Sequence, residues 1–89
     1  MKIIIKIEDR KVELILENNN KIVDKFSWRE ERNLSQKLLV EIDNLLKKNK
    51  LKSLDIKNMQ VKTDISERFT TVRIAKIVAK TFNFNNKAL

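Results

Sequence analysis

Aliphatic and polar residues alternate through the first fifth of the chain. In residues 2–8, and again in residues 11–17, every second position is aliphatic. These positions are Ile3, Ile5, Ile7, Val12, Leu14 and Leu16. A period of two predicts two β-strands that each bury one face, and the short Asp9-Arg10 connection between them predicts a hairpin.

A third strand is predicted after the Asn-rich segment at residues 18–20, which has the composition of a turn. It covers residues 21 to about 28, with Ile22, Phe26 and Trp28 expected on one side. The first three elements therefore form a three-stranded antiparallel meander. Trp28, at the end of its strand, is open to two interpretations, a core residue or an anchor at an interface.

The hydrophobic period changes after residue 33. Leucine and isoleucine recur at helical spacing up to about residue 49, and Asn33 with Gln36 has the spacing of a capping box. The stripe consists of Leu34, Leu38, Leu39, Ile42, Leu45 and Leu46, and it is expected to face the core. Val40 lies about 100° beyond the Leu39 edge of this stripe, so it is a candidate for an external contact. A fourth strand follows at roughly 56–62, with Met59 and Val61 inward.

A second helix is predicted at residues 67–82, and its apolar and small residues sweep an arc of roughly 220°. A surface helix normally shows an apolar stripe only a little over ~100° wide. The excess predicts a helix with two packing partners, one in its own chain and one elsewhere. We expect Val72, Ala75, Ala79 and Phe82 to face outward, and Phe69, Ile74 and Ile77 to face the sheet.

The resulting order is β-β-β-α-β-α, which predicts a two-layer α/β domain over residues 1–89 with a frayed tail at 83–89. Because a crossover between parallel strands is right-handed, both helices should cover one face of a mixed sheet in the order 3-2-1-4. The other face can meet water. Its residues are Lys6, Glu13, Glu17, Lys25 and Lys62, with Ile4 and Ile15 as apolar exceptions.

Three residue types are missing, and each absence removes a class of chemistry. The chain has no cysteine, no histidine and no glycine. Thiolate ligands, the usual general base and an ordinary phosphate-binding loop are therefore excluded. No nucleophile–base pair or metal cluster can be assembled, so we expect a protein that is not an enzyme, with no metal and no cofactor. Glu8 and Asp9 are read as turn chemistry, and turns should use Asn and Asp in place of Gly.

The formal net charge is +8 over 89 residues. It fits either solvated basic faces or an acidic partner such as RNA. Arg73, Lys76 and Lys80 form a basic row at i, i+3 and i+7, which is either a solvated face or a contact for an acidic partner or tRNA. The sequence has no run apolar enough to span a membrane and no signal-peptide pattern, so a cytoplasmic location is expected.

Two stretches resemble the N-terminal half of the TsaB/YeaZ family, whose half-domain has a ribonuclease-H-like core of the sugar-kinase/Hsp70/actin superfamily. The family motif S-F-T-G-[LV]-R-I-G, followed by A-x-A-K-G, is similar to residues 68–75 and 78–81, RFTTVRIA and VAKT. The family's first helix resembles Ser35, Leu38, Ile42, Leu45 and Leu46. Its fourth strand resembles residues 55–61 more loosely.

The resemblance implies a noncatalytic protein that pairs, through its first two helices, with a TsaD-like (Kae1/YgjD) partner. That partner makes threonylcarbamoyladenosine on tRNA. The predicted partner interface consists of Leu38, Val40, Thr71, Val72, Ala75, Val78, Ala79 and Phe82. In the same row, Thr71, Ala75 and Ala79 also suit close packing on a sheet. Among the three cations, the resemblance favours Arg73 and Lys80 because these match motif positions.

The chain also departs from the family pattern. The family's glycine-rich segment before S-F-T-G is replaced by residues 63–67, and its strand-1 ending by residues 5–10. The family's C-terminal half has no counterpart here. These departures put any nucleotide- or phosphate-binding role of the family's loops in doubt for this chain, whereas the helix pair that forms the pairing surface is retained. Pairing with a TsaD-like protein and pairing with a second copy both remain open. The alternative function is a small basic domain that binds tRNA or another RNA.

Overall fold

The computed structural model describes residues 1–8, 11–29, 34–64 and 70–87. Four strands form one sheet in the order β3-β2-β1-β4, with β1–β2 and β2–β3 antiparallel and β1–β4 parallel. The elements are β1 (Lys2–Glu8), β2 (Lys11–Asn18), β3 (Lys21–Arg29), α1 (Leu34–Lys48), η1 (Ser53–Asp55), β4 (Asn58–Thr63) and α2 (Thr70–Lys87). This confirms the predicted two-layer α/β class and strand order.

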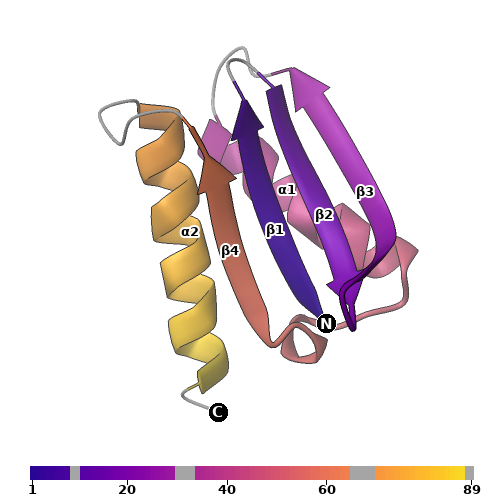
Figure 1. Ribbon diagram of the computed structural model, residues 1–89. Helices are drawn as coiled ribbons and strands as arrows, with labels where there is room; N and C mark the ends of the chain where they lie inside the picture. Colours follow the sequence, from indigo (N-terminus) through magenta and orange to yellow (C-terminus); the bar gives the residue numbers. More distant parts are fainter. Residues whose placement is uncertain (9–10, 30–33, 65–69, 88–89) are drawn as a thin grey trace.

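A single hydrophobic core joins the sheet to both helices. Alternate residues of β1 and β2 are fully buried, and so is Val72 of α2. The cluster comprises Ile3, Ile5, Ile7, Val12, Leu14, Leu16, Leu38, Ile42, Leu45, Leu46, Ile56, Met59, Val72, Ala75 and Ala79. Figure 1 shows α1 behind the sheet and α2 alongside β4 at one margin. The strand periodicity thus places one apolar face against the helices, as predicted.

The edge strand β3 corrects one prediction. Phe26 pairs with Leu14 and Trp28 with Val12, so both lie on the helix side, where their rings stand 5.9 Å apart. The register shifts between Leu16 and Glu17, and Ile22 consequently pairs with Glu17 on the opposite face. The prediction that Ile22 shares a side with Phe26 and Trp28 is wrong, because a β-bulge with one extra residue inverts the alternation.

Two predictions about the helices are also wrong. Leu39 was expected in the core, but its side chain is 56% exposed because it lies at the border of the stripe, about 100° from Leu38. The tail from residue 83 was expected to fray, but α2 continues to Lys87. Asn83 holds the end of α2: its Oδ1 accepts from the Met59 amide (2.8 Å) and its Nδ2 donates to the Met59 carbonyl (2.9 Å).

Among the described residues, three turn the chain with positive φ. Asn19 (φ 53°) and Asn20 (φ 66°) make the β2–β3 turn, as predicted for a glycine-free chain. The third is Lys50 (φ 57°), where neither Asn nor Asp is present. Lys50 donates its amide to Lys47 O (3.1 Å) and Leu51 donates to Leu46 O (2.8 Å), which is a Schellman ending for α1.

Candidate interaction surface

The two helices leave large aliphatic side chains on their outer surface. Leu39 and Val40 of α1 are 56% and 55% exposed, and Ile77 of α2 is 64% exposed. Ile74 and Val78 of α2 pack partly against the core. Scattered single apolar residues on a surface are ordinary, but three on one helix pair form a candidate contact surface.

The orientation of α1 follows from its neighbours. Lys48 reaches Asp24 of β3 (Nζ–Oδ2 3.3 Å), so the flank of α1 that carries Lys48 faces β3. Leu39 projects about 180° away from Lys48 around the helix, so it lies on the flank toward α2. Val40 lies on the outward face between these flanks. We call Leu39, Val40 and Ile77 the outer helix surface.

The predicted orientation of α2 is wrong. Val72, Ala75 and Ala79, expected to face outward, are buried in the core. Ile77, expected to face the sheet, is the most exposed aliphatic residue of the helix. Phe82 and Ile74 are half-buried, and Phe69 lies outside the described residues. The physical reason is size, because small residues on the sheet side let the helix backbone approach the strands closely.

The eight residues predicted for the partner interface therefore have different positions. Val40 is exposed, as an external contact requires, whereas Leu38, Val72, Ala75 and Ala79 are core residues of this chain. Val78 and Phe82 are half-buried. Thr71 belongs to α2, but its side chain lies outside the described part of the chain. The predicted interface did not include Leu39 or Ile77. The sequence pattern could not identify Ile77 as exposed, because the second helix is apolar on every side except its basic row.

A polar cluster fixes α1 against the edge strand. Asp24 accepts hydrogen bonds from Asn49 Nδ2 (3.1 Å) and the Lys25 amide (2.8 Å), and it pairs with Lys48. The hydrogen bond from Asn49, helped by those from Lys25 and Lys48, holds the pKa of Asp24 below its usual value. The cluster positions α1 and so supports the outer helix surface.

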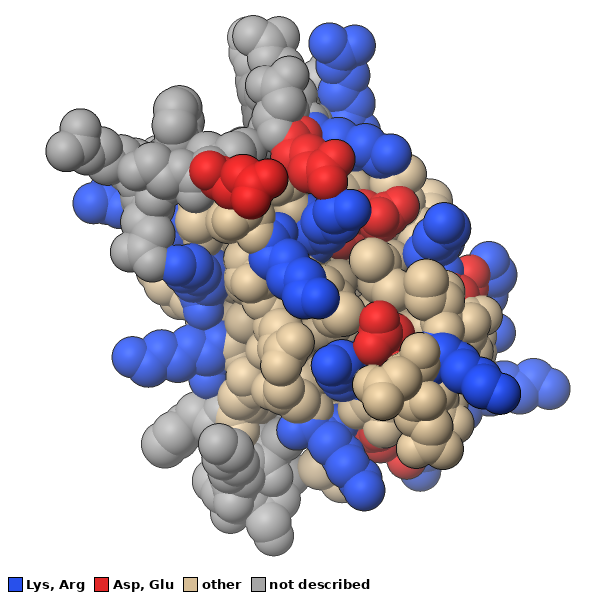
Figure 2. All heavy atoms as spheres, viewed as in Figure 1, with Lys and Arg blue, Asp and Glu red and all other residues tan. Residues whose placement is uncertain are grey.

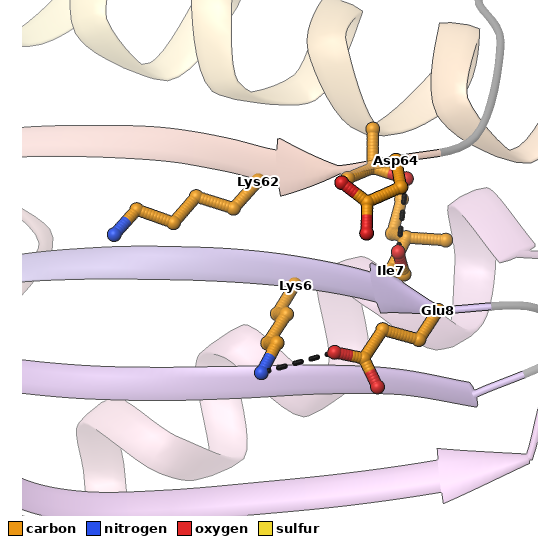
Figure 3. Close-up of a pocket in the computed structure, with 6 residues that line it drawn as sticks. Lys6, Ile7, Glu8, Lys62 and Asp64 are labelled. Atoms are coloured by element: carbon orange, nitrogen blue, oxygen red, sulfur yellow. Dashed lines mark hydrogen bonds and ion pairs between the residues drawn. The ribbon is translucent and has the colours of Figure 1, made fainter.

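A shallow pocket of mixed charge lies where the carboxyl ends of β1 and β4 meet, the usual place for a ligand in parallel sheets (Figure 3). Its charged residues are Lys6, Glu8, Lys62 and Asp64. Lys6 pairs with Glu8 (3.0 Å), and the hydrogen bond that Lys6 donates to the Glu8 carboxylate raises the pKa of Lys6. Thr63 Oγ1 donates to the Ile7 carbonyl (2.9 Å). The ion pair thus joins Lys6 to Glu8, whereas Lys62 extends away from Asp64 (Figure 3). Asp9 lies outside the described residues.

The remaining predicted residues are simple to place. Arg73, Lys76 and Lys80 are all exposed on α2. Trp28 is half-buried against the core, and its Nε1 is buried without a hydrogen-bond partner among the described residues.

Among the residues that the structure describes, no three potential ligands are grouped to hold a metal ion. No helix of the described residues has the length and apolarity that crossing a membrane requires.

Solved structures that share this fold include two YeaZ-related proteins. One is YeaZ from Pseudomonas aeruginosa, with a TM-score of 0.78 and 18% identity over 98% of this chain and 41% of that one. The other is described as an uncharacterised protein with similarity to the peptidase YeaZ from the same organism, with a TM-score of 0.79, 18% identity and 98% and 40% coverage. The chain therefore has a YeaZ-like fold and spans about two fifths of the length of each relative. No protein-family model and no curated protein sequence matches it.

Proposed function

We propose that this chain is a noncatalytic interaction protein that pairs through the outer surface of α1 and α2. The observation that carries the proposal is the exposure of Leu39, Val40 and Ile77 on a helix pair whose other described apolar side chains are buried or half-buried. The YeaZ-like fold supports it, since the sequence resemblance implies that this family pairs through its first two helices. A cytoplasmic location goes with the proposal.

The partner in the proposal is a TsaD-like protein or a second copy of the chain. In the first case the role is to support threonylcarbamoyladenosine synthesis on tRNA. In the second case, isologous pairing of two helix pairs gives a four-helix interface. In the first case, the proposal assigns the catalytic steps to the TsaD-like partner.

The test compares matched polar substitutions. Val40→Gln with Ile77→Gln removes two members of the outer helix surface, whereas Ile22→Gln with Leu54→Gln replaces two equally exposed aliphatic residues elsewhere. We expect light scattering to show a dimer, or co-purification to show a complex with the TsaD-type protein of the same source. The first pair should abolish either assembly, and the second pair should preserve it.

Two outcomes would refute the proposal. One is a strict monomer at high concentration that also fails to bind the TsaD-type protein. The other is an assembly that the Ile22/Leu54 pair disrupts as strongly as the Val40/Ile77 pair does, because that would place the interface elsewhere. Circular dichroism spectra that match wild type show that each variant is folded.

A further inference from the structure

The margin formed by α2 and β4 is basic and lacks acidic side chains within its elements. The α2 sequence contains Arg73, Lys76, Lys80 and Lys87 and no Asp or Glu, and β4 contains Lys62 and no acidic residue. The acidic residues between Asn58 and Lys87 are Asp64 and Glu67, both in the connection before α2. In Figure 2, blue side chains project from the α2 side of the molecule, whereas red and blue alternate over the strands.

The hydrogen bonds of Asn83 define where these cations point. Both main-chain groups of Met59 bond to Asn83, so this side of β4 is the free edge, away from β1. At 100° per residue, Lys76, Lys80 and Arg73 lie ~20°, ~60° and ~80° to one side of Asn83. The buried Val72, Ala79 and Ala75 lie ~20° to ~80° to the other side. The three cations therefore project past the β4 edge into solvent.

The same bonds set the level of the cations along the sheet. In Figure 1, α2 runs opposite to β4. Arg73 lies ten residues before Asn83, about 15 Å along the helix, and Thr63 lies four residues after Met59, about 13 Å along the strand. Arg73 is thus level with the end of β4 and Lys80 lies near its start. We call Arg73, Lys76 and Lys80 the basic margin.

The open face of the sheet differs in how its charges are balanced. There Lys2 pairs with Glu17 (3.8 Å) and Lys6 with Glu8 (3.0 Å), and on α1 Lys47 pairs with Asp43 (2.9 Å). Among the described residues, Arg73 and Lys80 form no ion pair. Figure 3 shows Lys62 extending away from Asp64 along β4. Because α2 contains no Asp or Glu, no carboxylate of its own helix neutralises the charges of Arg73 and Lys80.

We propose that the basic margin binds the phosphate backbone of a nucleic acid. Protein–protein interfaces deplete lysine at their centre and need an apolar core, whereas this row consists of cations. Lysine and arginine in a row are what neutralises successive phosphates and releases counterions. The described part of the row carries no aromatic side chain on which a base could stack, so the binding depends on charge and not on sequence.

The test measures the salt dependence of binding to a fluorescent oligouridylate of about eight nucleotides. Three phosphate contacts on a single strand give a slope of about −2 for log K against log salt. Arg73→Gln with Lys80→Gln should bring the slope to about −0.7 and weaken binding roughly 50-fold at 50 mM salt. The control, Lys25→Gln with Lys37→Gln, removes two exposed cations elsewhere and gives the same net charge, +6 instead of +8.

The proposal is supported if the salt slope becomes shallower in the Arg73/Lys80 variant and stays unchanged in the Lys25/Lys37 control. Three results overturn it. The first is an absence of oligouridylate binding at 50 mM salt, and the second is equal weakening in both variants, which would mean that net charge alone matters. The third is tighter binding of polyglutamate than of oligouridylate at equal charge, which would assign the margin to an acidic protein surface. None of these results depends on whether the outer helix surface pairs.

Discussion

Lys50 shows how single residues have to turn a chain that contains no glycine. Its φ of 57° ends α1 in the left-handed conformation that glycine adopts without steric cost. The two Schellman hydrogen bonds around it determine that geometry, so the backbone is held there in spite of the Cβ. The Cβ of Lys50 therefore disfavours the left-handed backbone conformation that this position adopts.

We predict that Lys50→Gly stabilises the protein by about 0.5–1 kcal/mol, because it removes the Cβ penalty of the left-handed conformation. Urea unfolding followed by the fluorescence of Trp28, the single tryptophan, measures the change. Lys47→Gly, inside α1, is the control and should destabilise by about 1 kcal/mol. A loss of stability in Lys50→Gly would show that strain at Lys50 is negligible.

Asp24 gives a prediction on pH. Its pKa is lower in the folded protein than the usual value of about 3.9 in an unfolded chain. The ionised carboxylate therefore stabilises the fold above about pH 3.9, and this contribution is lost as the pH falls through the folded-state pKa. Asp24→Asn should lower stability at pH 7 by about 0.5–1 kcal/mol.

The measurement is urea unfolding of wild type and Asp24→Asn at several pH values between 7 and 2. The difference between the two proteins should shrink only in the acid range below about pH 4. A difference that stays constant down to pH 2 would mean that Asp24 does not act through its charge.

At the scale of elements, one polar side chain links α2 to β4 in addition to the hydrophobic core that they share. Asn83 provides an acceptor and a donor to Met59 at the free edge, as a neighbouring strand would. An exposed edge is a liability that proteins cover with helices or loops. The amide of Asn83 therefore both anchors α2 and satisfies main-chain groups of the edge strand.

We predict that Asn83→Ala destabilises the protein by about 1–2 kcal/mol, since it leaves two main-chain groups of Met59 unpaired. Hydrogen exchange should also speed up at the Met59 amide. Asn44→Ala, at an exposed position of α1, is the control and should change stability by less than about 0.5 kcal/mol. Equal effects of the two substitutions would show that the Asn83 bonds add nothing.

The element scale also shows how far the sequence alone could go. Alternation around Ile5 and Leu14 predicts the first two strands and their buried face, and the right-handed crossover predicts the strand order. The bulge before Asp24 could not be predicted, because no glycine or proline marks it. The orientation of α2 was not determined by its pattern either, since a 220° apolar arc suits several rotations. Only tertiary contacts, such as those of Asn83, select one of them.

At the scale of the whole molecule, the two proposed surfaces share α2 but use different residues. Ile77 points outward, about 40° beyond Arg73, so the outer helix surface and the basic margin adjoin. A ligand on one could therefore affect the other through charge or steric overlap. Glutamine is neutral, so glutamine substitutions add no charge where the two surfaces adjoin. They can therefore distinguish the role of the outer helix surface from that of the basic margin.

We predict that the two surfaces act independently toward short ligands. Val40→Gln with Ile77→Gln should abolish assembly and leave the salt slope for an eight-nucleotide oligouridylate unchanged, because it removes no cation. Arg73→Gln with Lys80→Gln should reduce the slope and leave the molar mass of the assembly unchanged. The four substitutions combined should show the sum of both effects, as sites without shared partners do. A pairing variant that also loses the salt slope would mean that nucleic acid binds across two chains, with the basic margin of each contributing to one site.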